Sequence, residues 1–231
     1  MKREHKIYPF DHIRQMHAVI WAPEEQTGPL PLVLFLNGAG ERGADPKVLA
    51  RQALPKYLEQ GMELPFIVAC PQCPEGLTWE NVLFELDAVL EDVLTRYDID
   101  PARVSLTGIS MGGFGTWSYA ITRPRKFFRM APVCGGGMSW RCAALKNIPV
   151  WAFHGGADND VPPVYSRLMV DAVNKNGGNA KLTLYPGVDH FSWDRAYLKS
   201  NLLDWLCGKS DRRDEKECIE WTSSSDTRSD R

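Results

Sequence analysis

The stretch Gly108-Ile-Ser-Met-Gly112 decides how this chain is expected to fold, because of what stands on either side of it. An apolar run over 103–107 leads into it, and a helix-compatible run over 114–122 leads out. This order is typical of a nucleophile elbow, in which a strand reverses sharply into a helix with a serine at the turn. Glycines on both sides of the serine remove Cβ atoms that would collide there. The pattern predicts an exposed Ser110, beside the helix N–H group of Met111, which favours developing negative charge.

A serine hydroxyl is a weak nucleophile at neutral pH, so it needs a base within hydrogen-bond reach. His190 is the candidate base, because it lies between a strand predicted over 181–185 and a helical stretch that ends near residue 206. A loop in this place lies at the carboxyl edge of a parallel sheet, the same edge as Ser110. His154 ends an apolar strand and is expected to tie down a loop. The remaining histidines are expected at the solvated surface: His5, His12 and His17.

The third group must be an acid that lies between the serine and the histidine in chain order. Asp158 and Asp160 both meet this condition in the loop that follows a strand predicted over 150–153, and spacing alone does not separate them. A role of Asp158 in capping a turn or a helix is the competing interpretation. Asp189 adjoins His190, and the side chains of neighbouring residues diverge too much for one to orient the other.

A glycine-rich loop over 37–43 follows the apolar run 30–36. Glycines let a backbone approach a substrate closely and present its N–H groups. The N–H groups of Ala39 and Met111 are therefore predicted to form an oxyanion hole. The glycine spacing also fits a dinucleotide-binding loop, but no strand end with an acidic residue follows about 20 residues on. A phosphate loop is excluded because no Gly-Lys-Ser/Thr follows.

Together these segments resemble the α/β-hydrolase fold, and within it the branch of small carboxylesterases, dienelactone hydrolases and predicted peptidases. The resemblance covers residues 16–207. Four stretches carry it: Leu36-Asn-Gly-Ala-Gly-Glu-Arg-Gly43, Thr107-Gly-Ile-Ser-Met-Gly-Gly113, His154-Gly-x-x-Asp158-x-x-Val-Pro162 and His190-Phe-Ser-Trp-Asp-Arg-Ala-Tyr197.

The resemblance implies a triad of Ser110, His190 and Asp158, because the fifth position of the His-Gly-x-x-Asp pattern carries the acid in such enzymes. One departure concerns Asn37, which stands where the branch usually has a histidine that braces the oxyanion loop. Asparagine keeps one donor and one acceptor, but its reach is shorter.

Strands that alternate with helices predict an α/β protein with a mostly parallel central sheet and helices on both faces. The clearest helix is expected over 81–97, where apolar residues recur at helical spacing. The stretch between Val133 and Ile148 is too short for a large lid. Strands are expected over 16–21, 31–36, 66–70, 104–107, 130–133, 150–153 and 181–185.

Composition sets the class of protein. With 231 residues, 44% of them hydrophobic, the chain is expected to form one domain over 1–208, followed by a charged, disordered tail over 209–231. A net charge of −2 argues against nucleic-acid binding, and no run predicts a signal peptide or a membrane span. No metal or cofactor is expected, because Cys70 and Cys73 lack a second Cys-x-x-Cys pair. Reduced, cytoplasmic thiols are the simpler interpretation.

The residues and the resemblance together predict a serine esterase that hydrolyses short-chain or aromatic carboxylic esters through an acyl-enzyme on Ser110. Trp79, Trp140 and Trp193 fall in loops expected near the site, where they are predicted to receive an aromatic or alkyl group of a small-molecule ester. A peptidase or thioesterase with the same triad is the alternative within this chemistry. A non-catalytic binding scaffold is the alternative of a different class. The natural substrate and the oligomeric state stay open.

Overall fold

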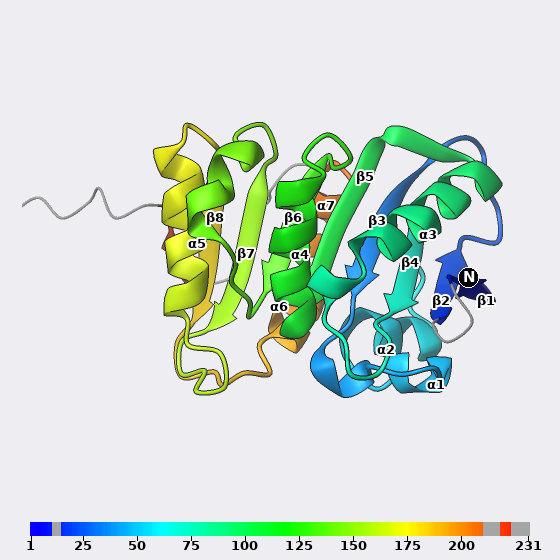
Figure 1. Cartoon of the computed structure of the whole chain (residues 1–231), viewed down its shortest axis with the longest axis horizontal. Coiled ribbons are helices and arrows are strands. Elements are labelled where there is room, and N and C mark those ends of the chain that lie inside the picture. The colour runs from blue at the N-terminus through cyan, green and yellow to red at the C-terminus, as the bar shows by residue number, and fades with distance from the viewer. Residues whose placement is uncertain (11–14, 210–217, 223–231) are drawn as a thin grey trace, which may run out of the picture.

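The computed structural model describes residues 1–10, 15–209 and 218–222. These residues form a sheet of nine strands in the order β1-β2-β4-β3-β5-β6-β7-β8-β9 (Figure 1). Strands β3 to β8 run parallel to their neighbours within this set, and β1, β2 and β9 add antiparallel edges. The strands are β1 (Lys2–Pro9), β2 (Gln15–Ala22), β3 (Leu30–Leu36), β4 (Ile67–Gln72), β5 (Ile99–Ile109), β6 (Arg129–Val133), β7 (Val150–Gly155), β8 (Ala180–Tyr185) and β9 (Ile219–Trp221).

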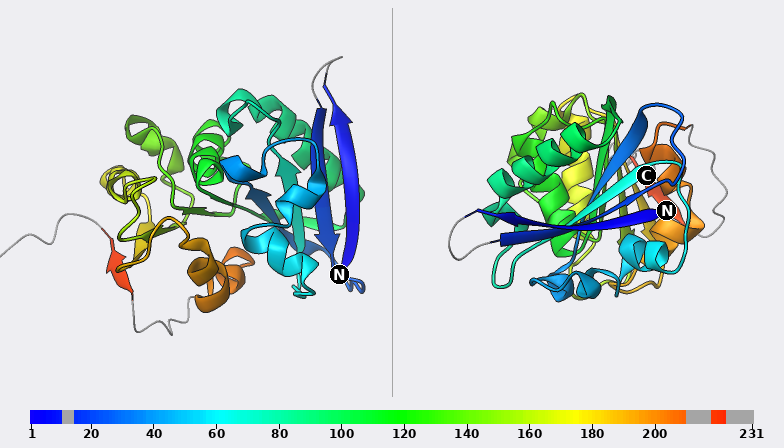
Figure 2. Two further views of the ribbon diagram at one scale, coloured as in Figure 1. Left: turned by 90° about the horizontal axis from the view of Figure 1, so that it is seen from below. Right: turned by 90° about the vertical axis from the view of Figure 1, so that its right-hand side faces the viewer.

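Helices cover both faces of the sheet, as Figure 2 shows. One face packs against α3 (Leu83–Arg96), α4 (Met111–Thr122) and α5 (Val164–Lys175). The other packs against α2 (Ala53–Glu59) and α6 (Trp193–Lys199). Short helices complete the described elements: α1 (Pro46–Leu49), α7 (Leu202–Leu206), and the 3₁₀ helices η1 (Ala39–Glu41), η2 (Trp79–Asn81) and η3 (Ser139–Leu145).

Strand β3 shows why the central strands are apolar along their whole length. Successive side chains of a strand point to opposite faces of the sheet. Leu32, Leu34 and Leu36 enter the core on one face, and Val33 and Phe35 enter the core on the other. The predicted α/β sheet is therefore confirmed, and η3 fills the stretch between β6 and β7 without forming a large lid.

The N-terminal edge differs from the sequence prediction, because residues 2–9 form a strand, β1, that pairs with β2. This pairing buries His17, which was expected at the surface, to 5% exposure. The His5 ring stacks on it with 5.1 Å between ring centroids. A strand with charged side chains is well suited to the edge of a sheet, where charge discourages further pairing. His12 lies outside the described residues.

The sequence predicts a disordered tail over 209–231, but the described residues of this segment include a strand. Ile219–Trp221 forms β9, which pairs antiparallel with β8. The Trp221 indole N–H donates to Asp171 Oδ1 at 2.9 Å, and the Arg167 guanidinium lies over the Trp221 ring. Residues 210–217 and 223–231 lie outside the described part of the chain, so the domain boundary at 208 stays a prediction.

None of the helices within the described ranges combines the length and the apolar character needed to cross a membrane.

A backbone contact between β3 and α4 sets the position of the elbow. A Cβ atom on Gly112 would lie 2.0 Å from the carbonyl oxygen of Leu36, and one on Gly108 would lie 2.5 Å from the carbonyl oxygen of Gly112. Both distances are far shorter than any real contact to a Cβ atom. Glycine is therefore required where β5 turns into α4.

A partly buried charge network joins α3 to the end of α4. Asp87 accepts hydrogen bonds from Tyr119 Oη at 2.9 Å and from Arg123 Nε at 2.8 Å. Burial alone would raise the pKa of Asp87, but these hydrogen bonds outweigh it and hold the pKa below its usual value.

We predict that Gly112→Ala destabilises the protein by about 3 kcal/mol or more, because overpacking against a backbone carbonyl cannot be relieved by a rotamer change. Gly40→Ala is the matched control, since no atom lies within 4 Å of the Cβ position there. Thermal and urea unfolding of both variants measure the effect. Equal stabilities would contradict the close contact between α4 and β3.

The Asp87 network predicts a specific pH dependence. Because the folded-state pKa is lowered, its stabilisation is complete above the unfolded value of about 3.9 and is lost as the pH falls through the folded value. The difference in unfolding free energy between the wild type and Asp87→Asn should be largest at neutral pH and shrink below about pH 4. A difference that stays constant from pH 7 to pH 3 would show that the charge plays no part.

Candidate active site

Ser110, His190 and Asp158 form one chain of hydrogen bonds. His190 Nε2 lies 2.9 Å from Ser110 Oγ, and His190 Nδ1 lies 2.7 Å from Asp158 Oδ2. A carboxylate only accepts hydrogen bonds, so Nδ1 carries the proton and donates to Asp158. In the neutral ring Nε2 is then the acceptor that faces the serine hydroxyl. The fold thus brings together the three residues predicted as nucleophile, base and acid.

Each of the three side chains stands at the carboxyl end of a parallel strand. Ser110 follows β5, Asp158 lies in the loop after β7, and His190 lies in the loop after β8. Ser110 has φ of 53° and ψ of −118°, a backbone conformation that non-glycine residues rarely adopt. The first turn of α4 holds this conformation through the hydrogen bond from Phe114 N–H to Ser110 O at 3.0 Å.

Backbone contacts hold the acid loop against the histidine loop. The N–H of Gly156 donates to Tyr185 O, and the N–H of Ala157 donates to Val188 O, both at 2.8 Å. A Cβ atom on Gly155 would lie 2.0 Å from the carbonyl oxygen of Asp189. These contacts fix Asp158 beside His190 by the shape of the backbone rather than by the side chains alone.

Asp158, and not Asp160, contacts the imidazole. Its carboxylate is buried, and Oδ1 accepts the backbone N–H groups of Asp160 at 3.0 Å and Val161 at 2.8 Å. Oδ2 faces His190 Nδ1 at 2.7 Å and also lies 3.2 Å from His154 Nε2. The residue combines the two interpretations that the sequence left open: it caps the turn and orients the histidine.

His154 is fully buried and ties the acid loop to α5. Its Nε2 donates to the carbonyl oxygen of Val161 at 2.8 Å, and its Nδ1 lies 2.7 Å from Ser166 Oγ. Burial lowers the pKa of His154. The residue holds structure in place, as its position at the end of a strand predicted.

The predicted oxyanion donors stand at two neighbouring turns. Ala39 begins η1, and Met111 is the first residue of α4, so its N–H has no acceptor within that helix. Asn37 braces the loop despite its short side chain: Oδ1 accepts the N–H of Cys73 at 2.9 Å and Nδ2 donates to Gly38 O at 2.6 Å. That Ala39 and Met111 bind an oxyanion stays a prediction.

A buried carboxyl group in the same loop was missed by the sequence analysis. Glu41 is 7% exposed, and burial raises its pKa. Its Oε2 lies so close to Gly38 that a Cβ atom there would be 3.0 Å away. Gln72 Nε2 donates to the Glu41 carbonyl oxygen at 3.0 Å. A charged residue among the glycines of a loop next to a buried strand was the available signal.

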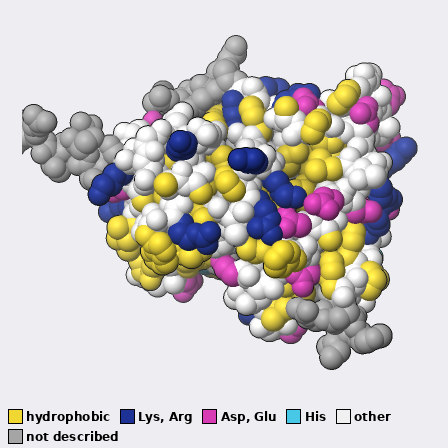
Figure 3. Space-filling view, turned by 45° about the horizontal axis from the view of Figure 1, so that its top comes forward, with side chains coloured by type: hydrophobic (Ala, Val, Ile, Leu, Met, Phe, Trp, Pro, Cys, Tyr) yellow, Lys and Arg dark blue, Asp and Glu magenta, His cyan; other side chains and the backbone are white. Residues whose placement is uncertain are grey.

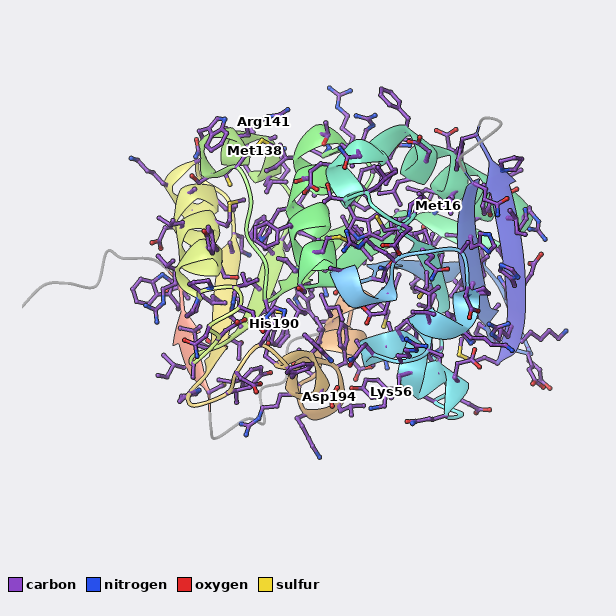
Figure 4. All side chains as sticks on the ribbon, turned by 60° about the horizontal axis from the view of Figure 1, so that its bottom comes forward. Met16, Lys56, Met138, Arg141, His190 and Asp194 are labelled. Carbon is purple, nitrogen blue, oxygen red and sulfur yellow. The ribbon has the colours of Figure 1, made fainter. Side chains whose placement is uncertain are left out.

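The three tryptophans predicted to bind substrate do not form a shared pocket. Trp79 is completely buried, where its indole N–H donates to Asn37 O and its side chain packs on Gly115. Trp140 lies in η3 between Met138 and Arg141, which Figure 4 shows well away from His190. These two assignments are therefore corrected: Trp79 supports the oxyanion loop, and Trp140 is exposed elsewhere.

Trp193 does lie at the site, but beneath it. Its ring stands edge-on to the His190 ring, with 5.6 Å between centroids, and the residue is 5% exposed. It supports the imidazole and offers little open surface. Two other aromatic side chains, Phe191 next to His190 and Tyr165 at the start of α5, are 56% and 45% exposed, and the sequence pattern did not single them out.

One group of side chains has the composition of a metal site. Cys134, Asp158 and His190 each present a ligand atom, and these atoms lie within 4.8 Å of one another. Burial, however, raises the pKa of the Cys134 thiol, and a thiol binds metals as the thiolate. The hydrogen bond between Asp158 and His190 further occupies the other two ligands. The group is suited to the triad rather than to a metal.

Known proteins resemble this chain in sequence or in structure. A candidate carboxymethylenebutenolidase from Escherichia coli O157:H7 is 28% identical over 205 residues, which cover 78% of this chain and 73% of that protein. The crystal structure of a thermostable esterase superposes with a TM-score of 0.76 at 30% identity over 87% of this chain. This chain spans 62% of the length of that esterase.

A candidate dienelactone hydrolase from Klebsiella pneumoniae subsp. pneumoniae MGH 78578 superposes with a TM-score of 0.69 at 20% identity. The superposition covers 90% of this chain and 100% of that one, and at this identity it concerns the fold. Residues 46–201, more than half of the chain, match the dienelactone hydrolase family. The chain, with its α/β-hydrolase fold, is therefore a member of the dienelactone hydrolase family.

Proposed function

We propose that this protein is a serine hydrolase that cleaves short-chain or aromatic carboxylic esters through an acyl-enzyme on Ser110. The observation that carries the proposal is the unbroken hydrogen-bond chain from Asp158 through His190 to Ser110. Membership of a hydrolase family and the likeness to an esterase of known structure support it.

The geometry suits acyl transfer in two steps. Ser110 Oγ attacks the ester carbonyl while its proton passes to His190 Nε2, and the N–H groups of Ala39 and Met111 stabilise the tetrahedral oxyanion. The intermediate collapses, and the leaving alcohol takes the proton from Nε2. Water then repeats the sequence on the acyl group and frees Ser110. Each oxyanion donor is typically worth about 100- to 1,000-fold in turnover.

Asp158 has a distinct electrostatic task. Its buried carboxylate holds the proton of His190 on Nδ1 and stabilises the imidazolium that forms when Nε2 takes a proton. The two backbone N–H groups on Oδ1 keep the carboxylate in place during both steps.

A non-catalytic scaffold has less support than the sequence alone suggested. Two features of the sequence favour a scaffold: Asn37 in place of a bracing histidine, and the charged C-terminal segment. Of these, Asn37 makes hydrogen bonds to Cys73 and Gly38 that brace the loop. A cytoplasmic location belongs to the proposal as well. It rests on the free thiols of Cys70, Cys73, Cys134, Cys142 and Cys207, which suit a reducing compartment.

Ser110→Ala tests the proposal directly. Hydrolysis of p-nitrophenyl acetate and butyrate should fall at least about 1,000-fold, because no other group replaces the nucleophile. Ser118→Ala, the same substitution on the helix that follows Ser110, should keep its rate within about twofold, since Ser118 Oγ contacts Glu80 and lies outside the triad. Equal rates for wild type and Ser110→Ala would end the proposal.

Asp158→Asn and Asp160→Asn separate the two acids of one loop. Asparagine at 158 would favour the wrong tautomer of His190, so kcat should fall about 1,000- to 10,000-fold. At 160 the side chain is exposed and contributes only its backbone N–H, so kcat should change by less than about threefold. Steady-state kinetics of both variants decide. A larger loss of kcat in Asp160→Asn than in Asp158→Asn would show that Asp158 is not the acid that orients His190.

A further inference from the structure

The structure points to an aromatic surface beside the triad that selects the substrate. We infer that Tyr165 and Phe114, on the side of the nucleophile, and Phe191, on the side of the histidine, bind an aryl group of the ester. Tyr165 sets the preference for aryl esters over esters with only small alkyl groups. The inference rests on the proposed function and names the substrate class for the same site.

The first observation is where the molecule exposes apolar side chains. Helix α5 carries Val164, Tyr165 and Leu168, which are 49%, 45% and 53% exposed. Figure 3 shows hydrophobic side chains gathered at the lower left, on the side of the molecule that carries α5. A cluster of exposed apolar side chains typically marks a surface that binds a ligand or a partner.

The second observation ties Tyr165 to the nucleophile. Its ring meets the Phe114 ring edge-on, with 6.0 Å between centroids at 63°. Phe114 lies one helical turn from Ser110 and donates its N–H to Ser110 O. Edge-on aromatic pairs leave ring faces and edges on which a third aromatic group can pack.

The third observation is that the backbone makes room for this pair. A Cβ atom on Gly136 would lie 2.7 Å from Tyr165 Cβ and 3.3 Å from Phe114 Cε1. Ser166 Oγ lies 2.8 Å from Gly135 O and so anchors α5 to the same glycine run. Glycines after β6 therefore allow the two rings to meet at this edge of the sheet.

The fourth observation concerns the histidine side. Phe191 follows His190 directly and is 56% exposed, with its ring centroid 4.9 Å from that of the buried Trp193. The centroids of the His190 and Phe191 rings are 6.2 Å apart. An exposed phenyl ring adds little to the packing of the core. An aryl group of a substrate bound at the triad would cover the Phe191 ring.

The experiment compares three esters by pH-stat titration: ethyl acetate, ethyl benzoate and benzyl acetate. The last two place the aryl group on the acyl side and on the alcohol side. Tyr165→Ala should lower kcat/KM for at least one aryl ester about 10-fold or more, mainly through KM, the scale of a lost apolar contact. Its activity on ethyl acetate should stay within about twofold, which also reports correct folding.

Two further variants sharpen the result. Tyr165→Phe keeps the ring and should retain aryl-ester activity within about threefold. Phe84→Ala removes an 81% exposed phenyl ring from α3 and should leave all three rates unchanged. A Tyr165→Ala variant that changes aryl esters and ethyl acetate equally would overturn the inference and leave the proposed function standing. A wild type that hydrolyses none of the three esters would end both.

Discussion

The contact of the first turn of α4 with the carbonyl oxygen of Leu36 is the constraint on which the site depends. It exists only because Gly112 has no side chain. Ser110 and Met111 come directly before Gly112 in the chain, and the loop that carries Ala39 begins directly after Leu36. One backbone contact therefore positions the candidate nucleophile relative to the loop that would hold the oxyanion.

A second backbone contact positions the other half of the site. Gly155 approaches the carbonyl oxygen of Asp189, and the loops after β7 and β8 share backbone hydrogen bonds. Asp158 and His190 lie on these two loops and thus meet at 2.7 Å. The triad is therefore assembled from two pairs of segments. In each pair, a glycine allows the two backbones to come into contact. Such backbone pinning gives the preorganised geometry that acyl transfer requires, with little dependence on flexible side chains.

Local sequence patterns predicted the parts that local physics determines. Strand and helix periodicity located β2 to β8 and α3, and the glycine spacing located the elbow at Ser110. The choice of Asp158 over Asp160 needed the resemblance to a family, because both residues have the same local surroundings. The structure adds the physical reason, since the backbone N–H groups of Asp160 and Val161 hold only the first carboxylate.

Local patterns did not predict features that depend on contacts between segments far apart in the sequence. Trp79 is buried because Gly115, on another helix, leaves room for its ring. Strand β9 has only three residues, Ile219–Trp221, and its place depends on the edge of β8 and on Asp171. The charged residues of β1 are typical of a solvated segment, yet the same charges suit an edge strand.

The central claim is that His190 and Asp158 activate Ser110. A fluorophosphonate probe followed by mass spectrometry of the digested protein tests it most directly, because such probes react with activated serines. The account predicts one adduct, on the peptide that contains Ser110, and loss of that adduct in His190→Ala. An unlabelled wild type, or an adduct on a different residue, would contradict it.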